Sequence, residues 1–223
     1  MEQVEFARRM IGGLAEKVIG VLWSGGKASS VLWHMTYSEM DNAVPIFIDH
    51  GKHPAETHEL LHQMYRAGNF RPEIWRNDDR LAGIRDGKIE GRPYDMHDVM
   101  VKKWLYDEVL AEEMDYDIIL SGERIARREE NRYLRFLEFF AWKDGGQTII
   151  IRPLLTWSEM DIWAYLLENK VPFNQRYSKG WRIVDYDDDW KPCDKPAWTV
   201  GNEYDETAEK LNIMAGDINA LPR

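Results

Sequence analysis

Residues 18–30 read VIGVLWSGGKASS, and this stretch decides the fold. Its first six residues form an apolar run with β-branched side chains, which predicts a short buried strand over 18–23. A Ser-Gly-Gly turn follows directly. Glycines let the backbone approach an anion closely, and the N-terminus of the next helix adds partial positive charge. This succession of strand, glycine turn and helix favours phosphate binding. The alternative is a turn in which glycine is needed only for the backbone conformation.

The loop also carries side-chain donors for an anion. Lys27 supplies an ammonium group, and three serines supply hydroxyls. The spacing differs from the Gly-x-x-x-x-Gly-Lys-Ser/Thr pattern of Walker-type loops. We predict that phosphates are bound by Ser24, Gly25, Gly26, Lys27, Ser29 and Ser30.

Strands and helices alternate outward from this loop, which predicts an α/β fold with a doubly wound parallel sheet covered on both faces. We expect an exposed excursion over 73–92 and little regular structure after 170. We divide the chain into a nucleotide-binding α/β domain (1–170) and an irregular or helical C-terminal extension (171–223) packed on it. The expected strands are 18–23, 44–48, 117–120 and 148–151, and the expected helices are 4–15, 29–40, 55–67, 96–114 and 158–168.

Composition narrows the class of protein. The 223 residues are 44% hydrophobic and 30% charged, as in a globular chain with one sizeable core. A net charge of −10 opposes binding to nucleic acid or anionic membranes, so an anion must be bound by local groups. The single cysteine, Cys193, excludes an internal disulfide. No signal peptide or long apolar span is evident, and we expect a cytoplasmic protein.

The segment VLWSGGKASSVLWHM (21–35) resembles the PP-loop of the ATP-pyrophosphatase superfamily. It is similar above all to the small subunit of bacterial ATP sulfurylase (sulfate adenylyltransferase subunit 2) and to phosphoadenosine phosphosulfate (PAPS) reductases. This resemblance implies an adenine nucleotide alpha hydrolase-like fold, with the nucleotide at the carboxyl ends of the strands. Segments that resemble the same group in the same order are 47–61, 97–110, 121–132, 152–166 and 171–181.

The resemblance also implies a reaction. An oxyanion such as sulfate would attack the α-phosphate of ATP, and pyrophosphate would leave. Two alternatives stay open: a PAPS reductase-type oxidoreductase, disfavoured because residues 199–223 contain no cysteine, and a non-catalytic nucleotide-binding accessory subunit. The implied ligands are ATP or PAPS with Mg²⁺ and an oxyanion substrate. The implied partner is a GTPase-like subunit or a second copy of the chain, with no membrane or nucleic acid.

The resemblance assigns roles beyond the loop. Lys27 and Arg124 would neutralise charge during catalysis. Asp49 and Gly51 would lie near the nucleotide, with Asp49 a candidate metal ligand. The alternative is a helix-capping or turn role for Asp49 and a plain turn for Gly51. The residues assigned to the substrate are Arg127, Arg128, Lys179 and Gly180. For the arginines, the alternative is a solvated helix face paired with neighbouring glutamates.

Other residues point to architecture or depart from the family pattern. Trp157, Asp161 and Trp163 are expected to be structural, and Cys193 to be inert. Ala28 stands where the family's loop has an aspartate that would help to hold magnesium. This departure puts metal placement and turnover in question.

Overall fold

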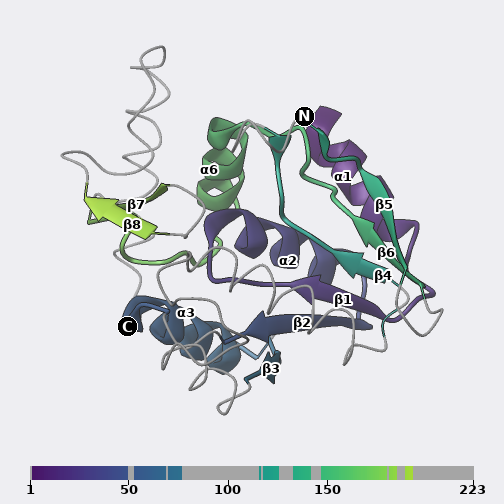
Figure 1. The fold of residues 1–223 in the computed structure, drawn as a ribbon. Helices are drawn as coiled ribbons and strands as arrows, with labels where there is room; N and C mark the ends of the chain where they lie inside the picture. Colours follow the sequence, from purple (N-terminus) through teal and green to yellow (C-terminus); the bar gives the residue numbers. More distant parts are fainter. Residues whose placement is uncertain are drawn as a thin grey trace, which may run out of the picture.

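The structure is a computed structural model that describes residues 2–49, 53–68, 70–76, 116, 118–125, 133–141, 147–179, 181–184 and 189–192. Figure 1 shows the arrangement of the helices and strands. The helices are α1 (Glu2–Gly12), α2 (Lys27–Glu39), α3 (Ala55–Arg66) and α6 (Glu159–Glu168). The strands are β1 (Ile19–Leu22), β2 (Ala43–Ile48), β3 (Glu73–Trp75), β4 (Ile118–Leu120), β5 (Leu137–Ala141), β6 (Gln147–Ile151), β7 (Trp181–Val184) and β8 (Asp189–Pro192).

A six-stranded sheet in the order β3-β2-β1-β4-β6-β5 forms the centre of the fold. Five strands run parallel, and β5 pairs with β6 in the antiparallel direction. The predicted α/β fold is therefore confirmed, with one strand of opposite direction at an edge. β5 was not predicted as a strand. The short connection from β5 to β6 suits an antiparallel pair, because a parallel crossover needs a dozen or more residues.

The central strands are buried because their sequences are continuously apolar. All residues of β1 and β4 are buried, as expected for parallel strands with packing on both faces. The edge strand β3 is more exposed, with Ile74 open to solvent. Residues 73 and 74 are exposed, as expected, but 73–75 pair with β2 as an edge strand instead of forming an excursion from the sheet. A three-residue strand with one exposed apolar side chain gives too short a pattern to recognise, and residues 77–92 lie outside the described residues.

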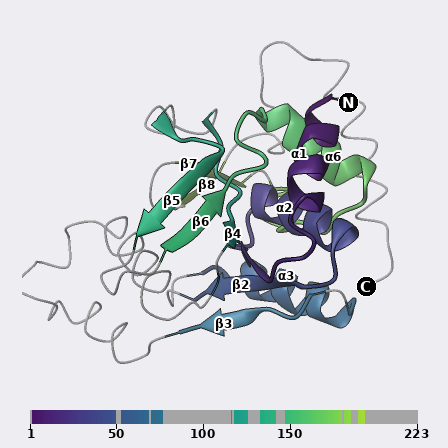
Figure 2. The same ribbon diagram turned by 90° about the vertical axis from the view of Figure 1, so that its right-hand side faces the viewer.

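The predicted helices within the described residues are present, with ends shifted by a few residues. Contacts join α2 to α1 and to α6, and Figure 2 shows these three helices beside one another. Trp23, Trp33, Trp157 and Trp163 belong to one buried core cluster. The structural role expected for the two later tryptophans is confirmed. The expected helix at 96–114 lies outside the described residues.

The chain after α6 is more regular than expected. β7 and β8 form a separate two-stranded antiparallel sheet. Before them, Val171, Phe173 and Tyr177 are buried in the same core cluster as the helices. Residues 171–179 thus pack on the sheet domain through apolar side chains.

The strand order places a reversal between β1 and β4. From β1 the chain builds β2 and β3 on one side, and β4 and β6 lie on the other. In open α/β sheets, ligands bind outside the carboxyl ends of the strands at such a reversal. The loop after β1 and the Ser121-Gly122 turn after β4 both follow strand ends at this position. The fold therefore makes these two loops the candidate ligand-binding position.

Candidate functional site

The loop after β1 takes a conformation that requires glycine. Gly25 has φ +75°, and a Cβ atom there would lie 2.6 Å from Thr57 Cγ2. The next residue, Gly26, is the N-cap of α2 and has no side chain to cap the helix. The first amides of α2 are therefore not capped by the N-cap residue. An anion is a suitable partner for such amides.

The serines of the loop take different positions. Ser24 is exposed, whereas Ser29 and Ser30 are buried. The Ser29 hydroxyl donates to the Gly26 carbonyl at 2.9 Å and accepts from the Ser24 amide at 3.3 Å. Ser30 Oγ accepts from Trp23 Nε1 at 3.3 Å. The two buried serines thus stabilise the loop by internal hydrogen bonds, and the exposed Ser24 has its hydroxyl 3.4 Å from that of Ser29.

The turn after β4 touches the start of α2. A Cβ atom on Gly122 would lie 3.2 Å from the Ser29 amide nitrogen and 3.3 Å from the Ala28 carbonyl carbon. Such distances are tight against backbone atoms, which cannot rotate away as a side chain can. Glycine at position 122 thus allows the two loops at the strand reversal to pack together. This residue was not predicted as part of the site.

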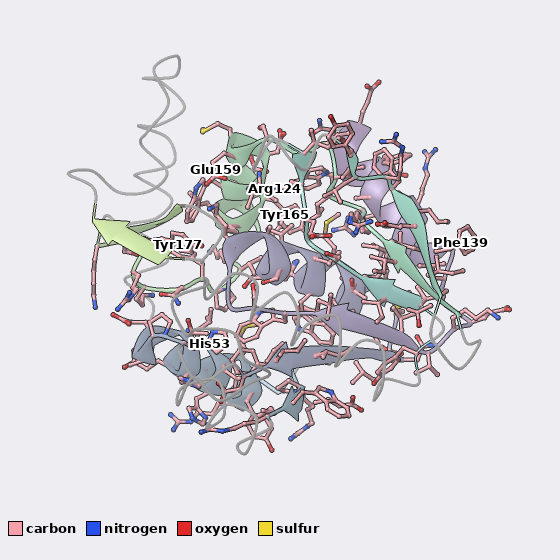
Figure 3. All side chains as sticks on the ribbon, viewed as in Figure 1. His53, Arg124, Phe139, Glu159, Tyr165 and Tyr177 are labelled. Carbon is pink, nitrogen blue, oxygen red and sulfur yellow. The ribbon has the colours of Figure 1, made fainter. Side chains whose placement is uncertain are left out.

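Lys27 and Arg124, the two predicted catalytic cations, meet at one carboxylate. Lys27 Nζ lies 2.8 Å from Glu159 Oε1, and Arg124 Nη2 lies 2.8 Å from Glu159 Oε2. The Lys27 side chain is 13% exposed and that of Arg124 is 3% exposed, whereas that of Glu159 is 47% exposed. Figure 3 shows Arg124 and Glu159 close together near the start of α6. For Arg124, the alternative of a solvated helix face is wrong because the side chain is buried.

Each cation has a second contact that does not involve Glu159. Lys27 Nζ lies 4.9 Å from the ring centroid of Tyr177 and 5.8 Å from that of Trp163, within the range of cation–π attraction. Arg124 Nη1 donates to the Trp157 carbonyl at 3.2 Å. Residues other than Glu159 thus also help to position both cations.

The electrostatics of Glu159 follow from this geometry. Burial alone would raise the pKa of Glu159, but the charges and hydrogen bonds of Lys27 and Arg124 outweigh it and lower the pKa to about 2. Glu159 is therefore ionised at neutral pH. Among the described residues, the half-buried Lys27 and the buried Arg124 thus share the partly exposed carboxylate of Glu159.

Asp49, the predicted nucleotide or metal ligand, lies at the end of β2. It is buried, and its Oδ2 accepts from Arg76 Nη1 at 3.0 Å. Its amide donates to the Trp75 carbonyl at 2.8 Å, which extends the pairing of β2 with β3. Within the described residues, no group of three or more His, Cys, Asp or Glu side chains is placed to hold a metal ion. The predicted neighbour Gly51 lies outside the described residues.

Lys179 lies beside the start of α3. Its Nζ is 3.7 Å from Glu56 Oε1, and Arg176 Nε lies 2.9 Å from Glu56 Oε2. Burial would raise the pKa of Glu56, but backbone and Arg176 hydrogen bonds and the two cations lower it. The other residues predicted to contact the substrate, Arg127, Arg128 and Gly180, lie outside the described residues, and so does Cys193.

Glu159 is the main residue that sequence reasoning missed. Ser158 caps α6 and forms a capping box with Asp161, as the expected local role of Asp161 suggests. A glutamate directly after such a cap is ordinarily explained by the helix dipole. Because the helix dipole already accounts for a glutamate at this position, the sequence gives no indication that Glu159 contacts Lys27 and Arg124. Only the packing of α6 against α2 reveals it.

No helix in the described part of the chain is long and apolar enough to cross a membrane.

Among relatives, an adenosine 5′-phosphosulfate reductase from Neisseria meningitidis serogroup B is 35% identical over 80 residues, covering 36% of this chain and 30% of the relative. One from Bacillus cereus is 25% identical over 187 residues, covering 82% of this chain and 74% of the relative. The match to the first relative thus spans less than a third of that protein's length.

Two solved structures share the fold. A PAPS reductase from Candida auris has a TM-score of 0.58 at 20% identity, covering 82% of this chain and 89% of the other. Candida glabrata FMN adenylyltransferase, solved with FAD and inorganic pyrophosphate, has a TM-score of 0.57 at 14% identity, covering 81% of this chain and 61% of the other. These likenesses show the PP-loop type of α/β fold.

The family is shown by the sequence itself. The phosphoadenosine phosphosulfate reductase domain matches residues 18–187, which include the loop after β1, Arg124, Glu159 and Lys179. The relatives named above are reductases, and the narrower resemblance to the ATP sulfurylase small subunit stays a prediction. This chain belongs to the phosphoadenosine phosphosulfate reductase domain family.

Proposed function

We propose that this protein is an enzyme that binds an adenine nucleotide at the loop 24–30 and cleaves ATP at its α-phosphate. The observation that carries the proposal is the meeting of Lys27 and Arg124 at one anion position beside that loop. A Lys and an Arg that approach the two oxygens of one carboxylate can equally approach two oxygens of a phosphate. The uncapped start of α2 adds amide donors on the same side.

In the proposed reaction, an oxyanion such as sulfate attacks the α-phosphorus of ATP. A new oxygen–phosphorus bond forms, and the bond from the α-phosphorus to the bridging oxygen of the β-phosphate breaks. Pyrophosphate leaves with the electron pair of that bond. Lys27 and Arg124 would neutralise the negative charge that builds on the leaving group, and the loop would hold the reacting groups in line.

A second candidate is reduction of an adenylylated sulfate, favoured by the names of the relatives. This reaction breaks the sulfur–oxygen bond of the sulfonucleotide and needs two electrons from an external dithiol. It also needs a thiolate nucleophile, and the chain has one cysteine, Cys193, with none in 199–223. We rank this reaction second because of that cysteine content.

Mg²⁺ is part of the proposal only as a companion of the nucleotide phosphates. The described residues hold no cluster of metal-binding side chains, and Asp49 is paired with Arg76. Ala28 supplies no carboxylate in the loop. In the proposal, Mg²⁺ is bound through the phosphate oxygens of the nucleotide, and we assign no step of the reaction to it.

The test is calorimetric titration with ATP, adenosine 5′-phosphosulfate and adenosine 3′,5′-bisphosphate, each with and without Mg²⁺. Preferred binding of ATP, followed by pyrophosphate release with an oxyanion acceptor, is the expected result. Sulfite release from the phosphosulfate in the presence of a dithiol, lost in Cys193→Ser, would establish the second candidate instead. No binding of any of the three nucleotides would disprove the proposed function.

A further inference from the structure

We propose that Glu159 is an internal counterion, which occupies the anion position between Lys27 and Arg124 and is displaced when a phosphate or sulfate group binds. The inference rests on the proposed function for the identity of the incoming anion. It assigns Glu159 as the group with which the ligand competes for the two cations.

The first argument is geometric. The two carboxylate oxygens each accept from a different cation at 2.8 Å, with Lys27 on Oε1 and Arg124 on Oε2. Phosphate and sulfate present pairs of oxygens in a similar way, and arginine and lysine are common partners of both. The carboxylate therefore stands where one edge of such a group would fit.

The second argument is that Glu159 is the partner able to move. Its side chain is 47% exposed, whereas the Lys27 and Arg124 side chains are 13% and 3% exposed. Lys27 keeps its contact with the Tyr177 ring, and Arg124 keeps its hydrogen bond to the Trp157 carbonyl, without Glu159. Rotation of Glu159 into solvent thus leaves both cations in place.

The third argument is that α6 does not depend on the Glu159 side chain for its start. Ser158 Oγ accepts from the Asp161 amide at 3.1 Å, and Asp161 Oδ2 accepts from the Ser158 amide at 2.7 Å. The capping box is complete with these two residues. The glutamate can therefore leave the cations without loss of the helix cap.

The charges explain why a counterion is needed. Two cations that are close together and largely removed from solvent are costly unless an anion compensates them. Glu159 compensates them in the absence of ligand, and its low pKa is the counterpart of that attraction. A bound phosphate or sulfate would take over the compensation. The consequence is that anion affinity is lowered by the need to displace the carboxylate.

The experiment is calorimetric titration with inorganic pyrophosphate of the full chain, Glu159→Gln and a matched control, Glu138→Gln. Glu138 pairs with buried Arg152 at 2.8 Å and is also 47% exposed, but it lies on β5. Both variants remove one negative charge, so a general charge effect appears equally in both. We expect Glu159→Gln to bind pyrophosphate about fivefold more tightly than the unaltered chain. We expect Glu138→Gln to bind pyrophosphate with the same affinity as the unaltered chain.

A second variant protects the test against a folding defect. Glu159→Asp keeps the charge on a shorter side chain that reaches both cations less well. We expect its affinity for pyrophosphate to lie between that of the unaltered chain and that of Glu159→Gln. The inference is overturned if both Glu159 variants bind as the unaltered chain does or more weakly, or if none of the proteins binds pyrophosphate. Failure of every variant to bind adenine nucleotides would instead count against the proposed function, because pyrophosphate carries no adenosine.

Discussion

Asn174 Nδ2 donates a hydrogen bond to Thr57 Oγ1 at 3.0 Å, and the two residues are 117 positions apart in the chain. Both side chains are buried. Thr57 also lies against the loop after β1, since a Cβ atom on Gly25 would be 2.6 Å from its Cγ2. The hydrogen bond therefore joins the segment after α6 to the start of α3 and, through Thr57, to the loop after β1.

This relationship predicts a measurable coupling energy. Asn174→Ala removes a buried donor and leaves Thr57 Oγ1 without it, so we expect the free energy of unfolding to fall by about 1–3 kcal/mol. Urea denaturation of Asn174→Ala, Thr57→Val and the double variant measures the coupling. If the two single effects simply add in the double variant, the hydrogen bond does not contribute to stability.

Gly25 is expected to tolerate no side chain. Gly25→Ala combines a positive φ with a clash against Thr57, whereas Gly68→Ala has a φ of +89° and nothing within 4 Å of the added Cβ. The strain at either position is about 1–3 kcal/mol, and the clash adds to it only at Gly25. We expect a clearly larger loss of unfolding free energy in Gly25→Ala. Equal losses in chemical denaturation would show that Thr57 does not restrict the loop.

His34 links stability to pH near neutrality. Burial and the nearby charge of Arg8 lower the pKa of His34 below 6.5, and its Nδ1 lies 3.0 Å from the Tyr165 hydroxyl. The unfolded chain therefore binds more protons than the folded one between the lowered pKa and 6.5. The stability contributed by neutral His34 is present above pH 6.5 and is lost as the pH falls through the folded-state value.

The check is the unfolding free energy above and below pH 6.5 in the unaltered chain and in His34→Phe. The variant should show a flatter dependence on pH. His62→Gln, at an exposed position on α3, serves as the control and should keep the original slope. A slope unchanged in His34→Phe would contradict the prediction.

Glu159 makes a corresponding prediction at acidic pH. Its pKa is lowered from 4.5 to about 2, so the folded state binds fewer protons than the unfolded state between these values. The stability from the ion pairs is present above pH 4.5 and is lost as the pH falls toward 2. Because the side chain is partly exposed, we expect the effect to be less than about 1 kcal/mol. Glu159→Gln should show a shallower fall in unfolding free energy over this range than Glu138→Gln.

Ala28 offers a gain-of-function test of the proposed chemistry. Ala28→Asp introduces a carboxylate at the position where the PP-loop resemblance implies one. Position 28 lies in the first turn of α2, where an aspartate is also favourable to the helix. We expect Mg²⁺ to strengthen ATP binding by about tenfold more in Ala28→Asp than in the unaltered chain, a difference of ~1.4 kcal/mol. Ala28→Asn, similar in shape but uncharged, should show no such gain. Titration of ATP with and without Mg²⁺ decides the matter, and an equal Mg²⁺ effect in all three proteins would contradict the expectation.

The strands and helices that could be predicted are those with a strong local pattern. β1 and β4 are continuous apolar runs, and α6 begins at a capping box that the residues themselves encode. β3 and β5 were missed for a physical reason. Both are edge strands with exposed apolar residues, such as Ile74 and Phe139. β3 pairs with β2, from which α3 separates it in the chain, and β5 pairs with β6 in the antiparallel direction. Neither pairing is visible in the local sequence pattern.

The sequence by itself determined the strand, the glycine loop after it and the helix that follows, because Gly25, Gly26 and the apolar run before them act through local backbone preferences. Only the tertiary structure decided that Lys27, Arg124 and Glu159 meet. Lys27 and Glu159 start two helices, and Arg124 lies in the loop after β4. The order of strands in the sheet and the packing of α6 on α2 bring them together, and no local pattern encodes either.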